Sequence, residues 1–593
     1  MKGPSLPLEL QGGNADAVSI SLESLILSDG TSVEIPRVGV TVVVGANNVG
    51  KSTLLRETNE ALGYDPSTQS ANFRLLSRPN LNRSGSAVDV LAWLAERVPM
   101  SPRSNTGPTN GFVAVGTGNQ GMDPRWLQGQ WEWLSHPSDR LGPFHRFFVH
   151  YLTAEARIGQ ISPQQRRDDF TEPPTQPMHF LEDNPEQLRM LQTLSERIFQ
   201  QTLTLDWLSN HVRLRVGKTS VQAPPVDAVN PEYHQSLAEL PNLMDQGDGM
   251  RSVFGLLIPL IIAARPITII DEPEAFLHPP QAAALGRILG ELAAENHLQI
   301  IVATHDRNVL TGLLQSEADI SVVRLDRQEN STRAYQLDPA ELRALWDDPV
   351  LRYSNVLDGL FHRLVVLTEA DQDCRFYAAA LEHASTLAPL RLASSDVLFV
   401  PSGGKAGLPK LAKALKAVQA PVVASPDLDI LNNDVTLHAL VNAFHGEWDR
   451  LDRDYKVATN QFRQPKAPRT VQHVCDAIAG ALRDHVLEQY TSDHRKLVQG
   501  ELYVESPFHE LKSRGEKAFD RGQAAGAAAR LLQELGVLGI VPVRVGELEN
   551  FAPFLEVGKG PEWLPAALEA GAHRDQDVQD HIQRILAVHA PTL

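Results

Sequence analysis

The sequence predicts an α/β protein of two domains, each built on a parallel sheet and each carrying a helical insert. The chain has 593 residues, whereas a single hydrophobic core rarely serves more than roughly 250–300 residues. In both halves, short apolar strands run into glycine-rich or acidic loops and alternate with helices, which is typical of parallel sheets. We expect the domains at 1–345 and 346–593, with helical inserts at about 160–240 and 435–538.

Composition indicates a soluble protein without a broad basic surface. The net charge is −18, so a contact with nucleic acid must use a local channel or metal ions. The two cysteines, Cys374 and Cys475, lie far apart, which suits a reducing compartment and excludes a disulfide framework. The start lacks the apolar core of a signal peptide, and the longest apolar run, 253–264, is too short to span a bilayer. We therefore expect a cytoplasmic protein that does not enter a membrane.

The first binding motif is Val40–Thr53, in which an apolar strand runs into G-x-x-x-x-G-K-S. The two glycines let the backbone curl so that its N–H groups point at phosphate oxygens. The lysine is expected to reach the β- and γ-phosphates, and the serine hydroxyl to bind Mg²⁺ at the positive end of the following helix. The motif predicts a nucleoside triphosphate site formed by Gly45, Asn48, Gly50, Lys51, Ser52 and Thr53.

Two further strands bring acidic and imidazole groups to the same edge of the predicted sheet. The segment Pro266–Pro279 contains a buried strand that ends in Asp271, placed to hold Mg²⁺. Glu272 follows it and is placed to polarise the water that attacks the γ-phosphate. The strand Gln299–Ala303 leads to His305. Because ligands bind at the carboxyl edge of doubly wound sheets, we expect these groups beside the phosphate loop.

A glycine-rich turn, Gln246–Ser252, opens an apolar helix upstream of these strands. Together the four motifs resemble the ABC-type ATPase head of chromosome-maintenance and DNA-repair ATPases. The resemblance implies that Gly247, Asp248 and Gly249 contact ATP held by a second copy of the chain, and hence a homodimer at least. Gln246 stands where serine is usual in the transporter form of this turn.

The segment between the phosphate loop and the glycine turn holds the first insert. Residues 184–210 have apolar side chains at helical spacing, and no heptad pattern is long enough for an extended coiled coil, so we expect a compact helical insert. The stretch 160–177, rich in Pro, Gln and charge, is expected to be an exposed loop. The strand 147–152 leads to Arg157, which is either a nucleotide sensor or an ordinary surface arginine.

After a polar connector at about 326–348, a second α/β pattern begins. Its strands are expected at 364–367, 397–400 and 421–424, and its helices at 374–383 and 408–418. Acidic residues follow the first and third strands, and the glycine pair of the second strand is followed by a lysine. Because the carboxyl ends of parallel strands meet at one edge, the acids should gather there.

The gathered acids are Glu369, Asp427 and Asp429. Three carboxylates within a few ångströms repel one another unless a divalent cation compensates, and hard oxygen ligands suit Mg²⁺ or Mn²⁺. Such ions can activate water and stabilise the leaving oxygen of a phosphodiester. The alternative is a set of solvated acids at strand ends.

This half resembles the Toprim domain, a Rossmann-like fold of primases, topoisomerases and overcoming-lysogenization-defect (OLD) nucleases. Its glutamate and the acid four positions later match Glu369 and Asp373, although Ala370 replaces the usual glycine, and its DxD matches Asp427 and Asp429, with Asp434 as a supporting acid. Residues 543–551 resemble the late strand-plus-acid element of the nucleases, with Pro542 indicating a sheet edge. The resemblance implies that the metal ligands are Glu369, Asp373, Asp427, Asp429, Glu547 and Glu549.

A basic stretch lies within the second insert, at 508–519. In the nuclease family a basic residue neutralises the scissile phosphate, and the candidates here are Lys512, Arg514 and Lys517. The alternative is a solvated helix face that carries no such role.

An ABC-type ATPase joined to a Toprim domain is the arrangement of the OLD family. The resemblance implies an ATP-gated, metal-dependent nuclease that cuts DNA and takes part in bacterial defence against phage. Its catalytic residues would be Glu272, His305, Glu369, Asp427 and Asp429. Two alternatives remain: a nuclease that cuts RNA such as tRNA, and an ATP-dependent switch whose Toprim site has decayed. A neighbouring accessory protein also remains open as a partner.

Overall fold

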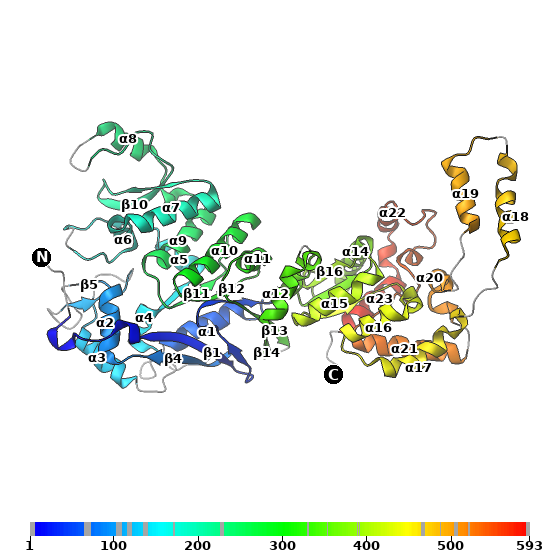
Figure 1. Ribbon diagram of the computed structural model, residues 1–593, viewed down its shortest axis with the longest axis horizontal. Helices are drawn as coiled ribbons and strands as arrows, with labels where there is room; N and C mark the ends of the chain where they lie inside the picture. The colour runs from blue at the N-terminus through cyan, green and yellow to red at the C-terminus, as the bar shows by residue number, and fades with distance from the viewer. Residues whose placement is uncertain are drawn as a thin grey trace. The chain divides into compact units, whose positions relative to one another are not determined.

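The computed structural model describes residues 6–63, 73–101, 110–115, 121–134, 140–169, 172–225, 230–328, 331–352, 354–387, 390, 392–463, 469–486, 488–502, 508–519 and 522–588. The chain divides into two compact units, Met1–Asp348 and Pro349–Leu593, and each is described by itself (Figure 1). Each unit contains a parallel sheet with helices, so the α/β class predicted for both halves is confirmed.

The first unit is centred on a six-stranded sheet in the order β14-β13-β3-β12-β11-β7. Its strands are β3 (Gly39–Val44), β7 (Val149–Leu152), β11 (Ile267–Asp271), β12 (Gln299–Ala303), β13 (Ile320–Gln328) and β14 (Ser331–Gln336). All neighbours are parallel except β13 and β14. β3 and β12 are buried along their whole length, as expected for central strands rich in Val and Ile and covered on both faces.

The helices around this sheet begin directly after its strands. α1 (Lys51–Gly63) follows β3, α10 (Pro279–Glu295) follows β11, and α11 (Arg307–Leu314) follows β12. α9 (Asp248–Ile262) precedes β11 and is buried on nearly all sides, in keeping with its apolar sequence. A separate antiparallel sheet, β2-β1-β4, is formed by β1 (Ser19–Leu27), β2 (Ser32–Glu34) and β4 (Leu76–Ser84).

The insert of the first unit is not wholly helical, which corrects the expectation for 160–240. It contains the helices α6 (Pro177–Asp183), α7 (Pro185–Phe199) and α8 (Pro231–Glu239) and the sheet β8-β10-β9, formed by β8 (Gln164–Gln165), β9 (Leu203–Asp206) and β10 (His211–Val216). The helical pattern stops at Gln200, which has φ 56° in the left-handed region. Leu203 and Leu205 continue the apolar spacing, but with the alternation of a strand.

The expected polar connector at about 326–348 is also wrong. Its start belongs to the antiparallel pair β13–β14, and its end forms α12 (Pro339–Asp347). Asp338 caps this helix by accepting hydrogen bonds from the N–H groups of Ala340 and Glu341, and Pro339 occupies its first position. Polar composition concealed an edge hairpin whose outer strand is largely exposed.

The second unit contains the parallel sheet β16-β15-β17. Its strands are β15 (Leu364–Thr368), β16 (Val397–Pro401) and β17 (Val422–Ala424), and α14 (Asp371–Leu387) and α15 (Leu408–Ala417) connect them. The residues of β15 are all buried, as its unbroken apolar sequence requires. A core of Phe376, Tyr377, Phe551 and Trp563 packs beside it.

No regular strand forms at 543–551, which corrects the expected late strand. Ile540 and Val543 pair with Ala424 and Asp427 through isolated parallel bridges only. Pro542 lies between them without an N–H to donate, and Gly546, at φ 115°, turns the chain into a 3-10 segment. The segment therefore follows the edge of β17, as Pro542 indicated, but as irregular backbone.

The second insert consists of helices in the residues that the structure describes. They are α16 (Asp434–Ala443), α17 (Trp448–Thr459), α18 (Val471–Ala481), α19 (Ser492–Leu502), α20 (His509–Arg514) and α21 (Gln523–Leu538). Among the described parts of both units, no helix has the combination of length and apolar character that crossing a membrane requires.

Candidate functional site

The phosphate loop joins β3 to α1 with the geometry that its glycines allow. Gly45 has φ 141° and Gly50 φ 107°, and Asn48 between them is also left-handed at φ 62°. A Cβ on Gly45 would lie 2.4 Å from the carbonyl oxygen of Leu325, and one on Gly50 2.5 Å from a methyl group of Leu75. Glycine is therefore required at both positions for two reasons: the backbone has a positive φ, and a Cβ would have no space.

Lys51 and Ser52 stand at the start of α1, and both side chains meet groups of the loop or of β11. The Lys51 ammonium donates to the carbonyl oxygens of Gly45 (2.8 Å) and Ala46 (2.9 Å). The Ser52 hydroxyl donates to Asp271 Oδ1 at 3.0 Å, so the expected serine and acid meet although 219 positions separate them. Burial lowers the pKa of Lys51, and the carboxylate of Glu272 is the largest opposing influence.

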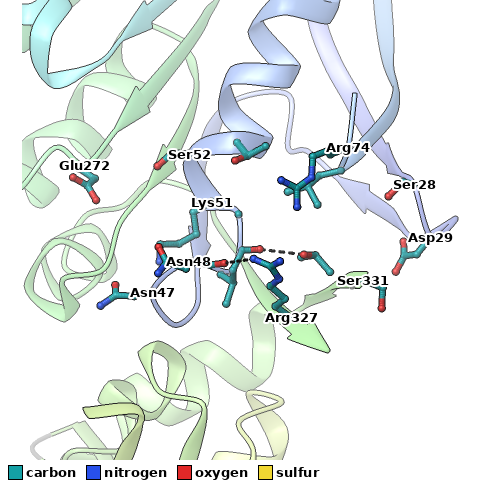
Figure 2. Close-up of a pocket in the computed structure, with 15 residues that line it drawn as sticks. Ser28, Asp29, Asn47, Asn48, Lys51, Ser52, Arg74, Glu272, Arg327 and Ser331 are labelled. Atoms are coloured by element: carbon teal, nitrogen blue, oxygen red, sulfur yellow. Dashed lines mark hydrogen bonds between the residues drawn. The ribbon is translucent and has the colours of Figure 1, made fainter. Parts of the chain in front are cut away.

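A pocket of about 680 Å³ opens above this loop. Figure 2 shows Lys51, Ser52 and Glu272 on one side of it, and Arg74, Arg327 and Ser331 on the other. The guanidinium of Arg327 donates to Asn48 O (3.3 Å), and the hydroxyl of Thr332 donates to Val49 O (3.2 Å). The hairpin β13–β14 thus supports the loop from behind, a role that the sequence analysis missed because it assigned this segment to a connector.

The groups beyond β11 and β12 form a small acid–imidazole cluster. His305 Nδ1 lies 3.4 Å from Glu272 Oε1 and 3.2 Å from Glu274 Oε1. Glu274 is buried and accepts hydrogen bonds from the Thr304 hydroxyl (2.8 Å) and the His305 N–H (2.9 Å). Burial raises the pKa of the Glu274 carboxyl. The sequence analysis did not select Glu274, although the second acid of D-E-P-E was a visible signal.

Arg157 is fully buried, so its interpretation as a surface arginine is wrong. It lies on α5 (Ala154–Gly159), and its guanidinium donates to the carbonyl oxygens of Asp271 (3.0 Å), Glu272 (2.9 Å) and Pro273 (3.4 Å). Burial lowers its pKa to about 10. Arg157 therefore holds the backbone that positions the two acids at the end of β11.

The glycine turn begins α9, where Gly247 is the residue before the first helical turn. Asp248 pairs with Arg251 one turn later, and a Cβ on Gly249 would lie 2.6 Å from the carbonyl oxygen of Phe276. None of the three turn residues is among those described as lining the pocket above the phosphate loop.

In the second unit, three carboxylates converge at the carboxyl ends of β15 and β17. One carboxylate oxygen from each of Glu369, Asp427 and Asp429 lies within 4.8 Å of the other two. The N–H of Asp427 donates to Glu369 Oε1 at 3.1 Å, which fixes the two strand ends together. Asp373 stands in the first turn of α14 and accepts from the N–H of Ala370 at 2.8 Å. Asp434 begins α16 as an exposed residue outside this cluster.

Three lysines surround the carboxylates. Lys405 pairs with Asp429, and Lys512 Nζ lies 3.4 Å from Asp429 Oδ2 and 3.5 Å from Glu547 Oε2. Lys559 Nζ lies 3.0 Å from Glu547 Oε2 and 3.5 Å from Glu549 Oε2. Of the three basic residues that the sequence analysis proposed, Lys512 is thus at the cluster, whereas Arg514 pairs with Glu510 at 3.7 Å. Lys405, the lysine after the glycine pair of the second strand, was noted in the sequence without an assigned role, and Lys559 was missed.

Three of the acids in this region, Glu369, Asp373 and Asp427, have raised pKa values. Burial, and then the charges of Glu369, Asp373 and Asp429, raise the pKa of Asp427 to about 8. Burial also raises the pKa of Glu369 and of Asp373. In the described residues, Asp429 Oδ1 and Glu549 Oε2 are buried without an ordinary hydrogen bond, although each lies beside a lysine ammonium. A partly buried set of oxygen donors of this kind fits a hard divalent cation.

The chain is similar to one described protein family and to one relative named as a nuclease. Residues 210–311 match the family described as "AAA domain, putative AbiEii toxin, Type IV TA system". A protein of Thermus scotoductus named "OLD nuclease" is 26% identical over 281 residues, which cover 45% of this chain and 48% of that protein. The chain is therefore matched to about half the length of this relative.

Solved structures with local similarity include two heads of SMC proteins and one part of an ABC transporter complex. An Smc head bound to the C-winged helix domain of ScpA has a TM-score of 0.33 at 12% identity, covering 54% of this chain and 99% of that chain. The SMC head domain from Thermotoga maritima has a TM-score of 0.28 at 12% identity, with coverages of 54% and 99%. CbiO1 from Clostridium perfringens has a TM-score of 0.28 at 16% identity, with coverages of 57% and 95%.

Proposed function

We propose that this chain is an ATPase of the OLD family and acts as an ATP-gated, divalent-metal-dependent nuclease that cuts DNA and serves as a bacterial anti-phage effector. In this proposal the first unit binds and hydrolyses ATP, and the second unit is a Toprim nuclease domain. The family relation supports an ATPase domain that binds ATP. The nuclease, its metals and its biological role are what the proposal adds.

The convergence of Glu369, Asp427 and Asp429 within 4.8 Å is the observation that carries the nuclease assignment. These three residues would hold one divalent ion, and the second group of Asp373, Glu547 and Glu549 would hold another. Bound there, such ions supply an activated water and stabilise the leaving oxygen of a phosphodiester. Lys512 and Lys405 place positive charge beside the carboxylates and would orient the scissile phosphate.

The ATPase half of the proposal rests on the contacts around the phosphate loop. Lys51 would bind the β- and γ-phosphates, and Ser52 with Asp271 would hold Mg²⁺. Glu272 would orient the attacking water, supported by His305. The glycine turn at Gly247 would complete this site from a second copy of the chain, which makes a homodimer part of the proposal.

A switch with a decayed Toprim site is the alternative that Ala370 suggested. The described non-glycine residues with positive φ do not include Ala370, so an alanine side chain causes no backbone strain at this turn. Its N–H also satisfies the Asp373 carboxylate at 2.8 Å. The loss of glycine therefore gives the decayed-site alternative little support, whereas an RNA substrate remains equally compatible with the carboxylates and lysines.

Cleavage of plasmid DNA and of total tRNA tests the proposal directly. Purified protein with Mg²⁺ or Mn²⁺ is expected to cut DNA, at a rate that changes when ATP is added. Glu369→Gln removes a charged ligand while keeping the side-chain shape, and we expect it to lower cleavage by roughly a hundredfold or more, the scale of losing one pre-organised electrostatic group. If the protein cuts tRNA and not DNA, the proposed substrate becomes RNA. ATP hydrolysis without cleavage of either polymer would favour the switch.

A further inference from the structure

A second pocket of the first unit lies at the opposite end of the sheet from the phosphate loop. It has a volume of about 320 Å³ and is formed where α9 ends and where the chain enters β7 and β11. Its lining residues come from α2 (Ala87–Arg97), from Ala114 and Val115, and from the segments 146–147 and 261–265. No function proposed above uses this pocket.

The pocket carries three arginines and, among its described lining residues, no acid. Arg265 is recessed and donates to the carbonyl oxygens of Val149 (2.8 Å) and Val115 (3.5 Å). Burial, and then the charge of Arg146, lower its pKa to about 10, with no carboxylate acting in the other direction. Arg97 is the third arginine and is partly neutralised by Glu96 at 2.8 Å. The pocket therefore has an excess of positive charge.

Next to Arg265, the His145 imidazole adds no negative charge: burial, Arg265 and Arg146 lower its pKa to about 4. A recessed guanidinium without a carboxylate is costly unless an anion from outside accompanies it.

The C-terminal end of α9 repels an anion less than a helix end with unpaired carbonyl groups would. The carbonyl oxygen of Ile261 accepts from the Gln187 side-chain amide at 3.3 Å, and that of Ala263 accepts from His150 at 3.0 Å. These donors offset the negative partial charge of the helix end. The remaining wall is apolar and includes the small exposed parts of Trp93 (9%) and Phe147 (3%), with the Arg97 guanidinium 5.0 Å from the centroid of the Trp93 ring, so part of a ligand there can be apolar.

We propose that this pocket binds a small phosphorylated molecule of about mononucleotide size. Its phosphate would lie against Arg265 and Arg146, where charge-assisted hydrogen bonds to guanidinium groups are strong. Its ring or apolar part would pack on Trp93 and Phe147. The volume is at the lower end of small-molecule sites, roughly 300–1,000 Å³, and the recessed position of Arg265 favours such a ligand over a nucleic-acid strand.

The test uses the full chain carrying Lys51→Ala, so that phosphate binding at the loop is weakened. AMP, inorganic phosphate and uncharged adenosine are titrated by calorimetry. We expect AMP to bind, and adenosine to bind at least about tenfold more weakly, because one charge-assisted hydrogen bond is worth about 1.5–3 kcal/mol and a tenfold change is about 1.4 kcal/mol. Adding Arg146→Gln should weaken AMP by a similar factor.

Arg146 is exposed, so its replacement should leave the fold intact, which circular dichroism checks. Arg189→Gln on the exposed face of α7 is the matched control and should leave AMP binding unchanged. The proposal is overturned if neither AMP nor phosphate binds at millimolar concentration, or if Arg146→Gln has no effect. It is also overturned if Arg146→Gln weakens only a twelve-nucleotide oligomer and not AMP, because that pattern assigns the arginines to nucleic acid.

Discussion

Replacement of Lys51 by alanine is expected to lower ATP hydrolysis by roughly a hundredfold to a thousandfold, the scale of losing one pre-organised charge-stabilising group. The Lys51 ammonium is held over the loop by the carbonyl oxygens of Gly45 and Ala46. These contacts hold the Lys51 ammonium in place before ATP binds. Lys51→Ala removes this positive charge, and no other group takes its place. Steady-state phosphate release measures the effect.

Lys218→Ala supplies the matched control for this prediction. Lys218 is an exposed lysine of the first unit, and its removal should leave hydrolysis unchanged. A Lys51→Ala protein that hydrolyses ATP within about threefold of the natural rate, a difference of only about 0.7 kcal/mol, would contradict the assignment of this loop as the triphosphate site.

Replacement of Arg157 by alanine is expected to destabilise the first unit by about 3–5 kcal/mol, the usual scale for leaving buried charged or polar partners unsatisfied. Its guanidinium donates to the carbonyl oxygens of Asp271, Glu272 and Pro273 and would be lost from all three, although the Glu272 oxygen also accepts from the Ala275 N–H at 3.1 Å.

Urea unfolding followed by loss of a bound fluorescent ATP analogue measures this destabilisation, because that signal reports on the first unit alone. Arg189→Ala, on a side chain that is 69% exposed, should change the unfolding free energy by less than about 0.5 kcal/mol. If Arg157→Ala is equally mild, Arg157 does not support the acidic end of β11.

In the first unit, the sequence predicted those site residues that lie within a continuous motif. The loop after β3 requires glycine at φ values that other residues avoid, so Gly45 and Gly50 were visible as a spaced pair. Asp271 and His305 follow unbroken apolar strands, which predicts their place at the sheet edge. The meeting of Ser52 and Asp271 follows from these two facts.

Other features depend on contacts between distant segments and left no local signal. Arg157 follows a short strand as a surface arginine could, and only the fold shows that it bonds to the backbone after β11. Leu203 and Leu205 fit a helix or a strand equally well, and the left-handed turn at Gln200 decides for a strand. Lys559 reaches Glu547 from an irregular segment whose sequence has no periodicity.

The carboxylate cluster was predicted from the sequence only in part. We expected Glu369, Asp427 and Asp429 to meet because the ends of β15 and β17 lie next to each other in a parallel sheet. The lysine pairs of Asp429 were not expected, since Lys405 and Lys512 arrive from a loop and from an insert helix. Sequence patterns predict the strand ends of such a site, whereas its charge balance depends on the folded chain.

The rate of metal-dependent DNA cleavage by two matched variants tests the central claim most directly. Asp427→Asn removes a carboxyl group from the carboxylate cluster, whereas Asp434→Asn removes a carboxyl group from an exposed position at the start of α16. The account predicts that Asp427→Asn abolishes cleavage in Mg²⁺ and Mn²⁺ while ATP hydrolysis continues, and that Asp434→Asn cuts at the natural rate. Equal cleavage by both variants would show that the second unit does not act as a nuclease through these carboxylates.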